Sequence, residues 1–101
     1  MKLRILEAAS QDLIEGWHFY ERRECGLGEY FLDSLSSDID SLQLYAGIHQ
    51  KHGEYHRMLS RRFPFAIYYK LNDDVAVIHA VLDCRRSPAW IRSRLDREAN
   101  K

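Results

Sequence analysis

The sequence lacks the features that mark several classes of protein. Its two cysteines, Cys25 and Cys84, lie far apart and form no CxxC pair, so reduced thiols are expected rather than a disulfide framework. No apolar run approaches the roughly 20 residues that span a bilayer, and the N-terminus has no long apolar segment typical of a signal peptide. The phosphate-binding motifs GxxxxGK[ST] and GxGxxG and the hydrolase motif GxSxG are also absent. We therefore predict a cytoplasmic protein with no membrane partner.

The chain carries no net charge, but its charges are unevenly distributed. Residues 1–50 contain four Lys/Arg against nine Asp/Glu, a net charge of −5, whereas residues 51–101 contain eleven against six, a net charge of +5. Eleven of the fifteen basic residues are arginine, whose planar guanidinium binds phosphate and carboxylate groups bidentately. The C-terminal half therefore predicts a surface that attracts an anionic partner.

The length of 101 residues predicts a single domain, residues 1–101, with one modest core. Hydrophobic periodicity predicts the order β-α-α-β-β-β-α, an α+β fold in which an N-terminal strand and an α-helical hairpin pack on an antiparallel sheet before a C-terminal helix. The predicted elements are a strand at 2–7, a helix capped by Ser10 and ending near Glu24, a helix over 29–45, strands at 54–59, 65–71 and 75–82, and a helix opening at Ser87-Pro88.

The strand predicted at 75–82, VAVIHAVL, is nearly continuous in apolar character. Such a run indicates a central strand that is covered on both faces. His79 within it is predicted to be a neutral, hydrogen-bonded core histidine rather than a catalyst. The segment 48–53, before the strand at 54–59, predicts a polar loop.

Three other histidines, His49, His52 and His56, are spaced by three and four residues. On one helix that spacing would favour a metal site, but Gly53 interrupts the helix and no cysteine or carboxylate completes a tetrahedral set. We therefore predict structural or solvated histidines, no metal and no cofactor. Cys84 lies between Asp83 and Arg85, which would favour a reactive thiolate, yet no histidine is placed beside it. A small buried residue is the preferred interpretation.

Arginines flank the hairpin formed by the strands at 65–71 and 75–82. Hairpin geometry returns the chain on itself, so Arg61 and Arg62 at its start and Arg85 and Arg86 at its end are predicted to face one region of space. Arg57 and a C-terminal helix carrying Arg92, Arg94 and Arg97 would extend a basic patch. Both a nucleic acid and an acidic protein segment fit such a patch. The alternative is that these arginines are solvated strand ends, some of them paired with the acidic helices.

Several short motifs, taken in order, resemble the RelE/ParE superfamily of type II toxin–antitoxin toxins over almost the whole chain. They are Tyr20-Glu21-Arg22, Gly26-Leu27-Gly28 with Phe31-Leu32 and Leu35, the run RFPFAIYY from Arg62, and the run VLDCRRSPAW that ends at Trp90. The resemblance implies a helical hairpin against a curved antiparallel sheet with a C-terminal helix. It also implies a growth-arresting toxin that forms a hetero-oligomer with a cognate antitoxin, an acidic and partly disordered chain.

The superfamily divides by mechanism, and the resemblance is closer to its ParE side. RelE-like members cut ribosome-bound mRNA without metal and carry cationic residues on the central strands and a C-terminal tyrosine, whereas ParE-like members bind and inhibit DNA gyrase. Here Phe65 and Trp90 occupy the positions of an arginine and a tyrosine, and indole cannot transfer a proton as phenol can. We therefore predict a gyrase inhibitor that is not itself a catalyst.

Two alternatives stay open, a ribosome-dependent mRNA endonuclease and an inactive relative that only binds an antitoxin. For the endonuclease, the candidate catalytic residues are Arg57, Arg61, Arg85 and His56. For binding of target or antitoxin, the candidates are Arg57, Arg61, Arg62, Phe65, Arg85, Arg86, Trp90 and Arg94.

Overall fold

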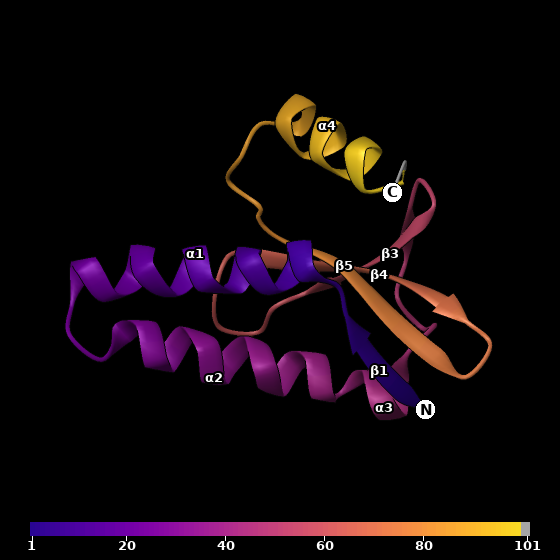
Figure 1. Cartoon of the computed structure of the whole chain (residues 1–101), viewed down its shortest axis with the longest axis horizontal. Helices are drawn as coiled ribbons and strands as arrows, with labels where there is room; N and C mark the ends of the chain where they lie inside the picture. The colour runs from indigo at the N-terminus through magenta and orange to yellow at the C-terminus, as the bar shows by residue number, and fades with distance from the viewer. Residues whose placement is uncertain (100–101) are drawn as a thin grey trace.

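A five-stranded sheet separates a layer of three helices from a single C-terminal helix in the computed structural model, which describes residues 1–99 (Figure 1). The elements, in chain order, are β1 (Lys2–Ile5), α1 (Glu7–Arg23), α2 (Leu27–Asp40), α3 (Leu42–Tyr45), β2 (Lys51–His52), β3 (Tyr55–Leu59), β4 (Phe65–Asn72), β5 (Val75–Asp83) and α4 (Pro88–Ala99). The predicted α+β fold is confirmed. None of these helices combines the length and apolarity that crossing a membrane requires.

The strands lie in the order β1-β5-β4-β3-β2, so β5 is an interior strand paired on both sides, as predicted, although β4 is the middle strand of the five. β2 to β5 are antiparallel, and β1 joins the other side of β5 in the parallel direction. The β4–β5 hairpin turns at Asp73, whose φ of 56° lies in the left-handed region that aspartate tolerates. β5 has a β-bulge at His79. Tyr68 of β4 pairs with Ala80 and the next residue, Tyr69, pairs with Ile78, so His79 has no partner residue on β4.

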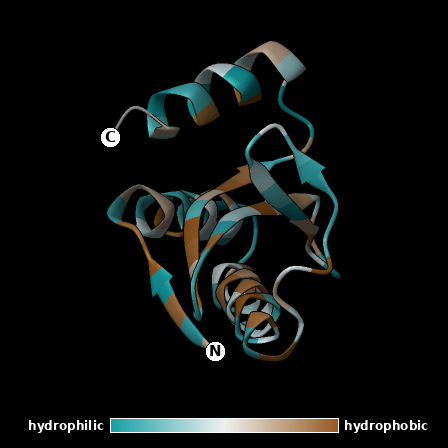
Figure 2. Cartoon of the chain, turned by 90° about the vertical axis from the view of Figure 1, so that its right-hand side faces the viewer, coloured by the Kyte–Doolittle hydropathy of each residue, from teal (hydrophilic) through white to brown (hydrophobic). Residues whose placement is uncertain are grey.

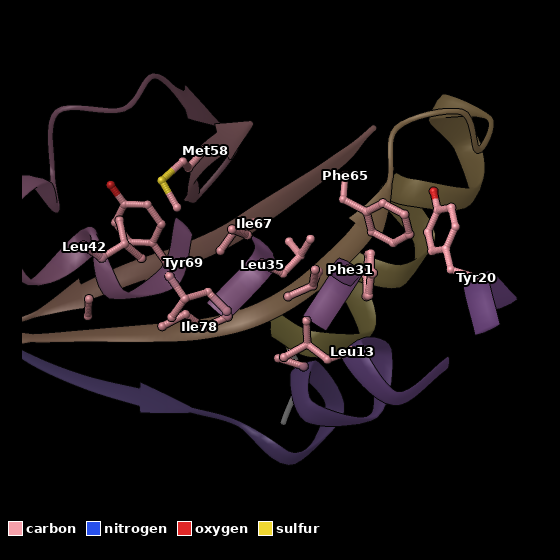
Figure 3. Close-up of a cluster of buried hydrophobic side chains, with 14 residues drawn as sticks. Leu13, Tyr20, Phe31, Leu35, Leu42, Met58, Phe65, Ile67, Tyr69 and Ile78 are labelled. Carbon is pink, nitrogen blue, oxygen red and sulfur yellow. The ribbon is translucent and has the colours of Figure 1, made fainter. Parts of the chain in front are cut away.

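The main core lies between the sheet and the helices α1 to α3. Alternate residues of β4 point into it, Phe65, Ile67 and Tyr69, because successive strand side chains face opposite sides of a sheet. Helical spacing brings fully buried Phe31 and Leu35 of α2 against them. Figure 3 shows aromatic rings gathered at one end of this core and Tyr69, Met58 and Leu42 at the other.

A second, smaller core occupies the opposite face of the sheet. It contains Tyr55, Ala66, Tyr68, Ala80 and Leu82, and the apolar side of α4 covers it. Figure 2 shows α4 on this outer side, away from the helical hairpin. β5 is therefore covered on both faces towards its end, whereas its residues Val75, Val77 and His79 are only half-buried.

Several predicted boundaries are wrong, beginning with the first strand, which ends at Ile5 rather than at residue 7. α1 begins at Glu7 rather than after Ser10, because the Leu6 N–H donates to the Ile78 carbonyl and the helix follows the sheet directly. The helix predicted over 29–45 begins earlier, at Leu27, and breaks at Ser41, whose Oγ donates to the Asp38 carbonyl at 2.6 Å and competes with the helical pattern. The predicted loop 48–53 contains the short strand β2.

Candidate functional site

A groove of about 700 Å³ runs between α4 and the face of the sheet formed by β3 and β4. Its floor is aromatic, because Tyr55 of β3 and Tyr68 of β4 both face α4. Its rim is mainly cationic, because it carries three arginines and only two carboxylates. The arginines are Arg57, Arg86 and Arg92, and the carboxylates are Glu54 and Asp96. An apolar floor with guanidinium groups at the edge suits a partner that carries both apolar and acidic side chains.

Arg57 is positioned by strand register. It pairs with Tyr68 across the β3–β4 ladder, and its Nε donates to the Tyr68 hydroxyl at 3.2 Å while Nη2 lies 3.5 Å from Cys84 Sγ. Within residues 1–99 no carboxylate lies at ion-pair distance from its guanidinium. Arg57 is therefore held in place by neutral partners and keeps its charge for a ligand. Cys84 was predicted to be a small buried residue, and in the structure it is half-buried.

The consecutive arginines after β5 have different roles. Arg85 binds the Asp83 carboxylate through Nε at 2.9 Å and Nη2 at 2.7 Å, and these hydrogen bonds hold the pKa of Asp83 below its usual value. Arg86 lines the groove, and its guanidinium lies 4.4 Å from the centre of the Trp90 ring. Stacking orients the Arg86 guanidinium without neutralising its charge. Of these two arginines, Arg86 is therefore the one that can bind an acidic partner.

Arg61 and Arg62 do not join this groove. The connection from β3 to β4 turns towards α2, where the Asp38 carboxylate accepts hydrogen bonds from Ser60 Oγ at 2.7 Å and the Arg61 N–H at 3.4 Å. Arg61 lines a separate groove of about 350 Å³, and the Arg62 guanidinium lies 6.0 Å from the Tyr30 ring centre. The expected single basic patch is therefore divided between two regions.

Two further predicted binding residues are part of the protein interior. Phe65 is only 7% exposed and packs in the main core against Phe31. Arg94 forms an ion pair with Asp12 at 2.6 Å and hydrogen-bonds Glu98 at 3.0 Å, with its side chain 12% exposed. Both residues stabilise the fold, and neither lines the groove between α4 and the sheet.

The histidines lie outside the groove or at its edge. His56, the candidate general base, alternates with Arg57 along β3 and therefore faces the opposite side of the sheet, where it stacks on Tyr69 and bonds the His49 carbonyl through Nδ1 at 2.8 Å. His52 lies at the groove edge. Burial lowers the pKa of His79, as expected for a neutral histidine, but its buried Nδ1 has no hydrogen-bond partner among the described residues, contrary to expectation. Residues 1–99 contain no group of three potential ligands that could hold a metal ion.

Sequence reasoning did not identify Tyr55 and Tyr68 as residues of this site, and it placed Arg92 in the basic patch without including it among the candidate binding residues. The signal for the tyrosines was strand alternation, since Tyr55 and Arg57 share one face of β3, and Tyr68 pairs with Arg57. Arg92 lines the groove in place of Arg94, a difference of two helical positions that turns a side chain through about 200°.

The same fold is found in two solved structures of toxin–antitoxin proteins. A chain from the chromosomal ParDE toxin–antitoxin system of P. aeruginosa superimposes with a TM-score of 0.70 at 17% identity, covering 80% of this chain and 92% of that one. The isolated E. coli RelE toxin superimposes with a TM-score of 0.57 at 16% identity, covering 95% and 96% of the two chains. No family model and no curated protein matches the sequence. The structural likeness confirms the RelE/ParE fold that the sequence motifs implied.

Proposed function

We propose that this chain is the toxin of a type II toxin–antitoxin system and arrests growth by binding and inhibiting DNA gyrase. The observation that carries the proposal is the groove beneath α4, in which Arg57 and Arg86 are oriented by neutral or aromatic partners and keep their charges available. The higher TM-score with the ParDE chain than with RelE supports a ParE-like rather than a RelE-like toxin.

The distribution of the candidate catalytic residues supports binding over catalysis. RNA cleavage without metal needs a base, an acid and cations around one phosphate. Arg57 lies in the groove, His56 lies on the opposite face of the sheet, Arg61 lines another groove, and Arg85 is paired with Asp83. These four residues do not converge on one point, so a ribonuclease site built from them is disfavoured.

The cognate antitoxin is proposed to place an acidic, partly disordered segment in the same groove. Its carboxylates would pair with Arg57, Arg86 and Arg92, and its apolar side chains would cover Tyr55 and Tyr68. Neutralisation then follows from occupation of the surface that the target needs. The toxin and its antitoxin would form a hetero-oligomer in the cytoplasm.

A supercoiling assay with purified gyrase tests the proposal. We expect the wild-type chain to inhibit supercoiling or to trap cleaved DNA, and Arg86→Glu to weaken inhibition by at least about tenfold, a change of 1.4 kcal/mol. Arg97→Glu is the matched control, because it makes the same charge change at an exposed α4 residue outside the groove lining. Normal supercoiling at saturating wild-type protein would refute gyrase inhibition.

A second assay distinguishes the alternatives. Codon-positioned breaks in ribosome-bound mRNA, detected by primer extension and lost in Arg57→Ala, would establish the ribonuclease instead. Normal growth on expression without an antitoxin would indicate an inactive relative. Arg86→Glu, but not Arg97→Glu, should also weaken binding of an antitoxin encoded beside the gene.

A further inference from the structure

The region around α3 exposes more apolar side chain than the fold explains. Four large apolar residues gather there, and we refer to them as the α3 patch: Leu44 (81% exposed), Ile48 (73%), Leu59 (58%) and Tyr45 (53%). Three of them line one groove of about 350 Å³ together with Met58 of the main core. Contiguous apolar surface of this kind marks an interface rather than an ordinary solvent-facing surface.

The α3 patch adjoins an open edge of the sheet. β2 pairs only with Tyr55 and His56, and the Arg57 N–H donates to the Gln50 carbonyl, so among the described residues the outer edge of β3 from there to Leu59 has no strand beside it. Folded proteins usually cover or charge such an edge to prevent pairing with another chain. Here it is bordered by apolar side chains instead, which favours association.

The groove contains one positive and one negative side chain, Arg61 and Asp38, which do not form an ion pair with each other. Arg61 lines the groove, and within residues 1–99 its guanidinium makes no hydrogen bond or ion pair. Asp38 lines the same groove and uses only Oδ2, for Ser60 Oγ and the Arg61 N–H, so Oδ1 has no partner in this part of the chain. A complementary partner would therefore carry an acidic group for the Arg61 guanidinium and a basic group for Asp38 Oδ1.

We propose that the occupant is a second copy of this chain, related by a two-fold axis through the α3 patch. In a two-fold interface each surface meets its own copy, so an axis that passes between Arg61 and Asp38 places Arg61 of one chain against Asp38 of the other and forms the reverse pair as well. The apolar residues Tyr45, Ile48 and Leu59 of both copies then cover one another. The zero net charge of the chain leaves no overall repulsion between the copies.

This dimer goes beyond the proposed toxin activity and uses a different surface. The groove beneath α4 and the groove of the α3 patch share no lining residue, and α3 packs on the other side of the sheet from α4, so a dimer formed through the α3 patch leaves Arg57 and Arg86 accessible. The measurement needs neither gyrase nor antitoxin. Either proposal can therefore fail without the other.

Sedimentation velocity of the purified full chain over a wide range of concentration tests the dimer. We expect a concentration-dependent species of twice the 12.0 kDa chain mass. Ile48→Lys should convert it to a monomer, since two buried ammonium groups would face each other. Ile14→Lys is the matched control, because Ile14 is an exposed apolar residue on α1, outside the α3 patch, and its replacement should leave the dimer intact.

A second pair of variants tests the charge geometry. Arg61→Glu should raise the dimer dissociation constant by at least about tenfold, because it places a carboxylate against Asp38 of the other copy. Arg62→Glu makes the same charge change at the neighbouring residue, which lies over Tyr30 rather than in the groove, and should have little effect. Circular dichroism confirms that each variant is folded. A monomer at every concentration, or a dimer insensitive to both Ile48→Lys and Arg61→Glu, would overturn the proposal.

Discussion

Replacement of Arg94 by leucine is the perturbation whose effect the structure defines most sharply. The Arg94 side chain joins three elements, because its Nη1 and Nη2 donate to the two oxygens of Asp12 in α1 at 2.6 and 2.8 Å and Asp12 Oδ2 also accepts the Val81 N–H of β5 at 3.0 Å. Its Nε donates to Glu98 within α4. The side chains of Asp12 and Glu98 are 8% and 5% exposed, so neither carboxylate has bulk water as a replacement partner.

The magnitude follows from the charge that remains after the substitution. Removing one partner of a buried ion pair costs about 3–5 kcal/mol, because the other charge stays buried without compensation. Leucine fills much of the arginine volume, so the loss is mainly electrostatic rather than a cavity effect. We therefore expect Arg94→Leu to lose about 3–5 kcal/mol of unfolding free energy at pH 7.5.

The pH dependence gives a second, more specific expectation. Burial raises the pKa of Asp12 above its usual value, and the hydrogen bonds from Arg94 offset part of that rise. Without Arg94 the folded-state pKa of Asp12 rises further, so the folded variant binds a proton at a pH where the unfolded chain, with an Asp pKa of about 3.9, does not. Linkage then makes the variant more stable as the pH falls, and the deficit relative to wild type shrinks from pH 7.5 towards pH 5.

Urea denaturation at several pH values, followed by circular dichroism, measures both effects. Arg92→Leu is the control, because it removes an exposed arginine from the same helix without breaking a buried pair. A loss for Arg94→Leu no greater than that for Arg92→Leu would refute the structural role of the pair. A deficit that stays constant or grows in acid would refute the assignment to Asp12.

Three further substitutions test other parts of the structure. Tyr69→Phe removes the hydroxyl that accepts the Gly47 N–H at 2.9 Å, and urea denaturation should show a loss of about 1–3 kcal/mol; unchanged stability would contradict this anchor. Gly16→Ala would place Cβ in steric overlap with the buried Phe31 ring, so it should lower the unfolding free energy by about 1–3 kcal/mol in thermal melts. Glu21 accepts two backbone N–H groups of the α1–α2 turn, which lowers its pKa, so its stabilising effect is present above the unfolded pKa of about 4.3 and is lost as the pH falls through the lower folded value. Glu21→Gln should therefore melt lower than wild type at neutral pH and converge with it in acid, and parallel melting curves would argue against this role.

The order of elements was determined by local sequence patterns. The runs rich in Val, Ile and Tyr at 65–71 and 75–82 with a short polar turn between them, the helical spacing at Phe31 and Leu35, and the Ser87-Pro88 pair each follow from the few residues concerned. The structure confirms them, with the Trp90 N–H donating to Ser87 Oγ at 3.1 Å at the start of α4. Sequence reasoning placed the start of α1 wrongly, because the Leu6 N–H bonds to Ile78, more than 70 residues away along the chain.

The function of each arginine was decided only by the tertiary structure. In sequence, Arg57, Arg85, Arg86 and Arg94 are equivalent cations in a basic half. Folding pairs Arg94 with Asp12, 82 positions distant, while Arg85 is paired by Asp83 two positions away. Among residues 1–99 the guanidinium of Arg57 is hydrogen-bonded to Tyr68 and Cys84, and that of Arg86 lies over the Trp90 ring, without an ion pair at either. A charge is available for binding only when no acid in the folded chain neutralises it, and for most of these arginines that depends on contacts between residues distant in sequence.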